Sequence, residues 1–210
     1  VGLGQSFAFV LVPPLARDLG LSVIETSTIF SISAIAWAVT SASWGRASDK
    51  YGRRNIAVIG LIGYSVSIIA LITPLFLVEK NVLDIAYLLP LLVLGRLING
   101  LIGSATRPAA FAYMADITDR SKRTKKFARL ESSFLIGTIM GPMIGGFLFL
   151  YSKTLPFYVF ALCGGIAAIG ILATFPKTIT QKTSEKIISK LSYKIRSIWH
   201  FLLSCSSLLL

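Results

Sequence analysis

The fold is decided by a short basic segment that reads Trp44-Gly45-Arg46-Ala47-Ser48-Asp49-Lys50-Tyr51-Gly52-Arg53-Arg54. Apolar runs without any charged residue lie on both sides of it, at residues 27–44 and 56–78. Each run is close to the ~20 residues with which a helix crosses ~30 Å of hydrocarbon. Because unpaired backbone groups cannot face lipid, both runs are expected to be helices. The segment is therefore predicted to be a tight turn between two membrane-spanning helices.

The same alternation of apolar run and polar connection continues through the whole chain. Further spans are predicted at residues 1–16, 85–114, 132–151 and 156–175, and a seventh begins near residue 198. Of the 210 residues, 54% are hydrophobic and 14% are charged, whereas a soluble domain carries about 25% charged residues. We therefore predict an all-α membrane protein. It has a six-helix bundle at 1–176, a basic linker at 177–197 and the start of a seventh helix at 198–210, and both ends are interpreted as truncations.

The positive charges gather in alternate connections and so predict the orientation of the spans. Arginines and lysines are concentrated in the connections 45–55, 115–131 and 177–197, whereas Arg17, Lys80 and Lys153 lie in the others. Cytoplasmic loops carry the excess of basic residues. The loops between spans two and three, four and five, and six and seven are therefore expected in the cytoplasm, beneath an inner membrane. This pattern accounts for the net charge of +12, and no nucleic-acid partner is expected.

Residues that bring catalytic or metal chemistry are scarce. Cys163 and Cys205 both lie inside apolar runs, and their spacing matches neither a disulfide framework nor a metal site. His200, at a predicted membrane edge, is the only histidine. An enzyme is not predicted, because no nucleophile–base pair or phosphate loop is present, and no metal or cofactor is expected. Between its lysines the linker carries isoleucines at helical spacing, which indicates an amphipathic surface helix or, alternatively, a regulatory or partner-binding helix.

Several residues of the 44–54 segment have a physical role in the predicted turn. Gly45 lets a neighbouring backbone come close, and Gly52 permits a turn conformation that other residues avoid. Asp49 can cap a helix or meet the positive N-terminus of one. Arg53 and Arg54 hold the loop in the cytoplasm and can pair with carboxylates. A generic cytoplasmic loop would need neither both glycines nor the aspartate at these spacings.

The segment resembles the loop 2–3 signature of the major facilitator superfamily, G-x-L-A-D-R-x-G-R-R, with mild departures at Ala47, Ser48 and Lys50. The resemblance implies an N-terminal half of two inverted three-helix repeats, completed by a second six-helix half. It also implies a cytoplasmic gate formed by Gly45, Asp49, Gly52, Arg53 and Asp116. In the family the aspartate of the loop further meets a helix of the second half. Arg54 is interpreted as a topology anchor.

Arg96 lies about ten residues inside the fourth predicted span, near the middle of the membrane. A charge at that depth costs at least ~2.5–3.5 kcal/mol on insertion scales, so such residues usually face an interior cavity and serve function. At 100° per residue one stripe of this helix holds Arg96, Gly100, Gly103, Arg107 and Ala110. The pattern resembles the R-x-x-x-G motif of proton-coupled members, which implies a role for Arg96 in proton transfer. The alternatives are an arginine paired with backbone carbonyls and, for Arg107, an interface anchor.

The fifth predicted span carries a second motif, Gly137-Thr138-Ile139-Met140-Gly141-Pro142-Met143-Ile144-Gly145-Gly146. Its glycines form a groove for close helix approach, and Pro142 removes a backbone donor and bends the helix. The motif resembles the helix 5 motif of drug:proton antiporters, which symporters typically lack, and therefore implies export. Residues 112–118 are also similar to tetracycline efflux proteins. Glu131 shares a helix face with Thr138 and is either a proton acceptor or the partner of a nearby basic residue.

Together these features predict proton-coupled efflux of a hydrophobic or amphiphilic small molecule by alternating access. The driving force would be the proton gradient rather than a cofactor. Gln5 and Asn99 are the candidate substrate contacts in the visible spans. Two alternatives stay open: a nutrient symporter or facilitator of the same superfamily, and a non-transporting membrane sensor with the same fold. The expected partners are the substrate, protons, the lipid bilayer and the second six-helix half.

Overall fold

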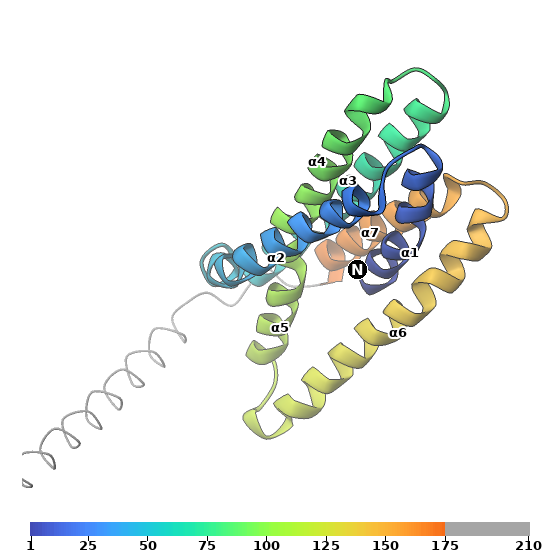
Figure 1. Ribbon diagram of the computed structural model, residues 1–210. Coiled ribbons are helices and arrows are strands. Elements are labelled where there is room, and N and C mark those ends of the chain that lie inside the picture. Colours follow the sequence, from blue (N-terminus) through green and yellow to red (C-terminus); the bar gives the residue numbers. More distant parts are fainter. Residues whose placement is uncertain (175–210) are drawn as a thin grey trace, which may run out of the picture. The chain divides into compact units, whose positions relative to one another are not determined.

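The computed structural model describes residues 1–174, which form a bundle of helices and, within that range, no strand (Figure 1). The long helices are α1 (Gly2–Asp18), α2 (Val23–Tyr51), α3 (Arg53–Glu79), α4 (Leu88–Leu101), α5 (Thr106–Asp116), α6 (Arg123–Phe149) and α7 (Leu155–Thr174). Three short 3-10 helices lie between them: η1 (Ile85–Tyr87), η2 (Gly103–Ala105) and η3 (Arg120–Lys122). The predicted all-α fold is confirmed. The predicted linker and seventh helix lie outside the described residues.

Five helical stretches of the described part are long and apolar enough to cross a bilayer. They are α2, α3, residues 85–116, residues 120–149 and α7. Helix α1 has 17 residues and would rise about 26 Å, slightly less than the ~30 Å of a hydrocarbon core. Helices α4 and α5, with η1 and η2, together occupy the single predicted span 85–114, which the structure extends to Asp116. With α1 included, the helices follow the predicted order of six spans.

Two helices are longer than their apolar runs suggested. Helix α2 begins at Val23 instead of residue 27 and continues to Tyr51, and α6 begins at Arg123 instead of residue 132. The start of α2 has a local cause: the Ser22 side chain accepts a hydrogen bond from the Glu25 amide, and the Glu25 carboxylate accepts one from the Ser22 amide. This capping box satisfies backbone donors that would otherwise be free. Hydrophobicity alone does not detect such polar helical turns.

The connections alternate between the two ends of the bundle. In Figure 1 the connections α1–α2, α3–α4 and α6–α7 lie toward one end, and the α2–α3 and α5–α6 connections lie toward the other. The second end contains the two segments rich in arginine and lysine, at residues 45–55 and 115–131. The helical order therefore separates the strongly basic connections from the weakly basic ones, as the charge pattern required.

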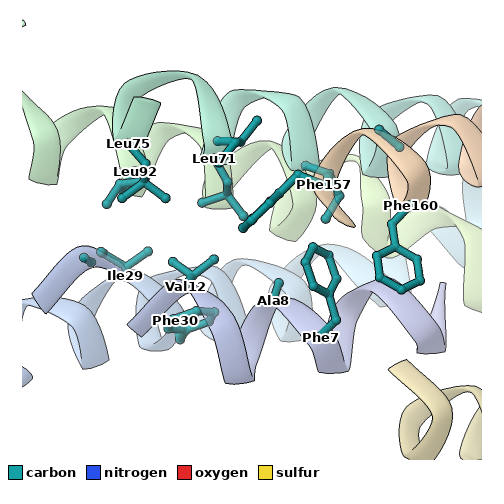
Figure 2. Packing of buried hydrophobic residues seen from close by; sticks show 14 of the residues in the cluster. Phe7, Ala8, Val12, Ile29, Phe30, Leu71, Leu75, Leu92, Phe157 and Phe160 are labelled. Carbon is teal, nitrogen blue, oxygen red and sulfur yellow. The ribbon is translucent and has the colours of Figure 1, made fainter. Parts of the chain in front are cut away.

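Helix α1 contributes much of the core. Phe7, Ala8 and Val12 are fully buried, together with partners from α2, α3, α4 and α7. The ring of Phe7 meets Phe157 edge-on at 4.9 Å between centroids and Phe160 at 4.5 Å (Figure 2). Such aromatic pairs add about 0.5–1.5 kcal/mol beyond their buried area. This packing fixes α1 against α7, although the two are far apart in sequence.

Glycines bring neighbouring helices into direct backbone contact. A Cβ atom at Gly60 of α3 would lie 2.5 Å from the backbone nitrogen of Thr106. A Cβ at Gly4 of α1 would overlap the Tyr64 hydroxyl of α3, which is itself buried. Since lipid supplies no hydrophobic force between helices, close packing at small residues is what holds such a bundle together.

Candidate functional site

The α2–α3 turn is a single residue. Gly52 has φ 94° and ψ 135° and is both the C-cap of α2 and the N-cap of α3. This is backbone geometry that a side chain would disfavour, and it is the role expected of Gly52. The observed turn is therefore much shorter than the predicted one over 44–54, because α2 stays helical through Tyr51.

Arg53 connects three helices at this turn. It forms ion pairs with Asp49 of α2 and with Asp116 at the end of α5, where its Nε lies 3.0 Å from Asp116 Oδ2. Its Nη1 also donates to the buried Ser48 hydroxyl at 2.6 Å. The Arg53 side chain is 15% exposed, whereas those of Asp49 and Asp116 are 45% and 41% exposed. The structure thus brings Asp116 of α5 to the neighbouring pair Asp49 and Arg53, and the three form one charge cluster.

Two expectations for this segment are wrong. Asp49 does not cap α3, whose N-cap is Gly52 without a side-chain hydrogen bond; its carboxylate pairs with Arg53 instead. Gly45 does not admit a neighbouring backbone within residues 1–174, because a Cβ built there would meet nothing within 4 Å. The physical reason for both is the same: α2 continues through these positions, so Gly45 and Asp49 lie on a helix surface rather than in a loop. Arg54, beside them, donates to the Leu172 carbonyl of α7.

Arg96 is buried in α4, with a relative exposure of 2%. Its guanidinium lies 5.4 Å from the ring centre of Phe9 in α1 and 4.9 Å from that of Phe30 in α2. The two rings stack on each other at 4.7 Å. No carboxylate pairs with Arg96 in the described part of the chain, and its Nε is buried without a hydrogen-bond partner there. The cation is therefore held by aromatic faces rather than by an ion pair.

The span that carries Arg96 is interrupted within the predicted stripe. The 3-10 helix η2 separates α4 from α5. It advances about 120° per residue instead of 100°, so three residues rotate the following face by about 60°. Gly100, before the interruption, lies against Ser33 and Ala36 of α2, and Arg107, after it, pairs with Glu131 of α6.

Polar side chains of α2 satisfy the backbone near this interruption. The Thr40 hydroxyl lies 3.0 Å from the Gly100 carbonyl and 2.9 Å from the Ser104 hydroxyl. The Trp44 indole N–H donates to the Leu101 carbonyl. In lipid an unsatisfied backbone group costs several kcal/mol, so these bonds allow the helix to depart from α geometry. Thr40 and Ser104 are not among the predicted residues, because no motif or spacing in the sequence marks them.

Arg107 and Glu131 form an ion pair between α5 and α6. Arg107 Nη2 lies 2.6 Å from Glu131 Oε2, and the guanidinium is 4.5 Å from the ring centre of Phe134. Both side chains are about 40% exposed, at 41% and 38%. Of the two roles considered for Glu131, the structure shows the partner of a basic residue. A cavity of about 130 Å³ adjoins this pair and reaches Val1.

The glycines of α6 form the predicted groove, and α1 lies in it. A Cβ at Gly141 would be 2.2 Å from the Leu3 carbonyl oxygen and from the Ser6 hydroxyl. Gly137 and Gly145 likewise face α1, with closest approaches of 3.1 Å each. Gly146, the last residue of the motif, lies outside this groove, because a Cβ there would meet nothing within 4 Å among the described residues.

The remaining predicted residues have mixed surroundings. Pro142 lies inside α6 and is half-buried, beside the groove glycine Gly141. Gln5 of α1 is half-buried, and Asn99 of α4 is buried at 3% exposure with Gly103 packed on its carboxamide. Asn99 is therefore closed off within the described helices, whereas Gln5 is partly accessible.

Comparison with known proteins decides the family. The model described as Major Facilitator Superfamily matches residues 1–209. The chain belongs to the major facilitator superfamily. This confirms the resemblance inferred from its motifs.

Relatives of this superfamily chain include drug resistance proteins. The quinolone resistance protein NorA of Staphylococcus aureus is 29% identical over 199 residues, which cover 92% of this chain and 48% of NorA. The class B tetracycline resistance protein of Escherichia coli is 31% identical over 180 residues, which cover 84% of this chain and 41% of that protein. The chain thus spans about half the length of the curated relatives it matches.

Proposed function

We propose that this chain supplies one six-helix half of a proton-coupled exporter of hydrophobic or amphiphilic small molecules. The observation that carries the proposal is Arg96, a cation buried at 2% exposure with no acidic partner in the described helices. An unpaired charge in a membrane span is costly and is retained where it serves a proton or substrate path. The similarity to quinolone and tetracycline resistance proteins supports export, at about 30% identity.

The Arg53 cluster supports a gate at the basic end of the bundle. Arg53 ties the ends of α2, α3 and α5 together through Asp49 and Asp116. The carboxylates are nearly half exposed, so they remain accessible to a second half of the protein. We assign the cluster to the cytoplasmic side because connections 45–55 and 115–131 hold most basic residues of the described part.

Transport in inverted vesicles tests the proposal. The full-length protein would be expressed, and inside-out vesicles acidified internally would be monitored with a pH-sensitive dye. Addition of tetracycline or a quinolone should release protons from the vesicles while radiolabelled drug enters. Vesicles that take up drug without proton movement would exclude antiport. Whole cells that accumulate the drug when the protein is expressed would indicate a symporter.

A further inference from the structure

A second cavity lies between α1 and α2, near the connection that joins them. Its volume is about 370 Å³, and its lining residues are Phe9, Pro13, Arg17, Val23, Thr26, Ser27 and Phe30. This size falls within the range of small-molecule pockets, which combine apolar walls with a few polar groups. None of the residues predicted as functional lines it.

We propose that this cavity binds an aromatic molecule that carries an acidic group, as a substrate subsite of the exporter. The inference rests on the proposed function and names the substrate class. Aromatic recognition follows from Phe9 and Phe30, whose rings stack at 4.7 Å and line the cavity. Phe9 is 46% exposed, so part of this residue remains accessible to a third ring.

The charge of the cavity selects an anion. Arg17 is the charged residue among those lining it, and it is exposed. Arg96 lies 5.4 Å from the ring centre of Phe9 and 4.9 Å from that of Phe30, without a carboxylate partner in the described helices. Arg17 at the wall and Arg96 beside the two rings therefore give the cavity a positive bias.

Two carboxylates lie near the cavity without lining it, and both already have partners. Glu25 Oε2 accepts hydrogen bonds from the Ser22 amide at 2.7 Å and from its hydroxyl at 2.8 Å. Asp18 interacts electrostatically with Lys153, whose pKa is raised mainly by its hydrogen bond to Glu79 and further by Asp18. An acidic ligand group placed beside Arg17 would gain an ion pair, whereas an amine there would meet only positive charge.

Binding of three matched probes tests the inference. The full-length protein in lipid nanodiscs would be titrated with tritiated 2-naphthoate, neutral 2-naphthalenemethanol and cationic 2-naphthylmethylammonium, with empty nanodiscs subtracted. The anion should bind about threefold to fivefold tighter than the neutral probe, as expected for one partly exposed ion pair. The cation should bind more weakly than the neutral probe. Equal binding of all three probes would overturn the inference.

Matched variants locate the site. Arg17→Gln should remove the preference for 2-naphthoate, and Arg17→Lys should keep most of it. Phe9→Leu should weaken all three probes by about threefold to tenfold, through loss of ring stacking. Arg46→Gln, at the far end of α2, removes the same charge without touching the cavity and should change nothing. Unchanged 2-naphthoate binding by Arg17→Gln would overturn the assignment. Since no gradient is needed, failure of antiport in vesicles would not affect this result.

Discussion

At the scale of single residues, the two functional arginines are held in opposite ways. Arg53 has two carboxylates and a hydroxyl around it, whereas Arg96 has two aromatic rings and no acid in the described helices. A guanidinium presents a planar fork of donors and a face that stacks on rings, so one residue type suits both surroundings. Because of this difference, we expect substitutions of the two arginines to have opposite effects on stability.

Substitution of Arg53 should destabilise the protein. Arg53→Ala leaves Asp49, Asp116 and Ser48 without their partner, and the pairs are partly exposed, so we expect a loss of about 1–2 kcal/mol. Arg53→Lys keeps the charge but loses the planar set of guanidinium donors. Its stability should lie between that of the unchanged protein and that of Arg53→Ala. Thermal unfolding in detergent measures the effect. Arg46→Gln is the control, and an Arg53→Ala protein as stable as this control would show that the cluster contributes nothing.

Substitution of Arg96 should separate stability from transport. Arg96→Gln removes a buried charge that has no ion-pair partner in the described part, so the unfolding temperature should stay unchanged or rise. In the full-length protein the same change should abolish proton-coupled transport, while drug binding is measured separately. The vesicle assay measures the proton-coupled transport, and thermal unfolding measures the stability. Retained coupling in Arg96→Gln would remove this residue from the proton path.

At the scale of elements, small residues and local interruptions decide how the helices meet. Helix α1 lies in the glycine groove of α6, and the 3-10 segment η2 turns Arg107 toward α6 while Arg96 stays beside α1 and α2. The interruption between α4 and α5 therefore separates a buried cation from an ion pair on one membrane span.

Two neighbouring glycines of α6 provide a matched test of the groove. Gly141→Ala places a methyl group 2.2 Å from the Leu3 carbonyl oxygen, so α1 must shift, and we expect about 1–3 kcal/mol of destabilisation. Gly146→Ala meets nothing within 4 Å and should be neutral or stabilise by up to about 1 kcal/mol through helix propensity. Thermal unfolding of both variants decides the matter. Similar losses in the two would contradict the packing.

At the scale of the whole molecule, the described residues form one bundle whose strongly basic connections share an end. Basic loops stay in the cytoplasm because their translocation is disfavoured. The charge pattern therefore predicts that the end with the Arg53 cluster is cytoplasmic and that the α1–α2 cavity lies toward the outer side.

Cysteine labelling checks this orientation. With Cys163 and Cys205 replaced by serine, a cysteine at Lys125 in the first turns of α6 should react with a membrane-impermeant maleimide in inside-out vesicles and not in intact cells. A cysteine at Asn81, in the α3–α4 connection, should show the reverse. The same label pattern for both positions would refute the orientation.

The sequence by itself determined the class, the number and order of spans, their orientation as a prediction, and the turn at Gly52. These depend on local composition and on the backbone preferences of single residues. Contacts across the bundle were decided only by the tertiary structure. They are the hydrogen bond of Thr40 to the interrupted fourth span, the contacts of Arg96 with Phe9 and Phe30, and the ion pair of Glu131 with Arg107. Hydrophobicity reports that a helix lies in the membrane, but its rotation and its neighbours depend on packing between residues far apart in the chain.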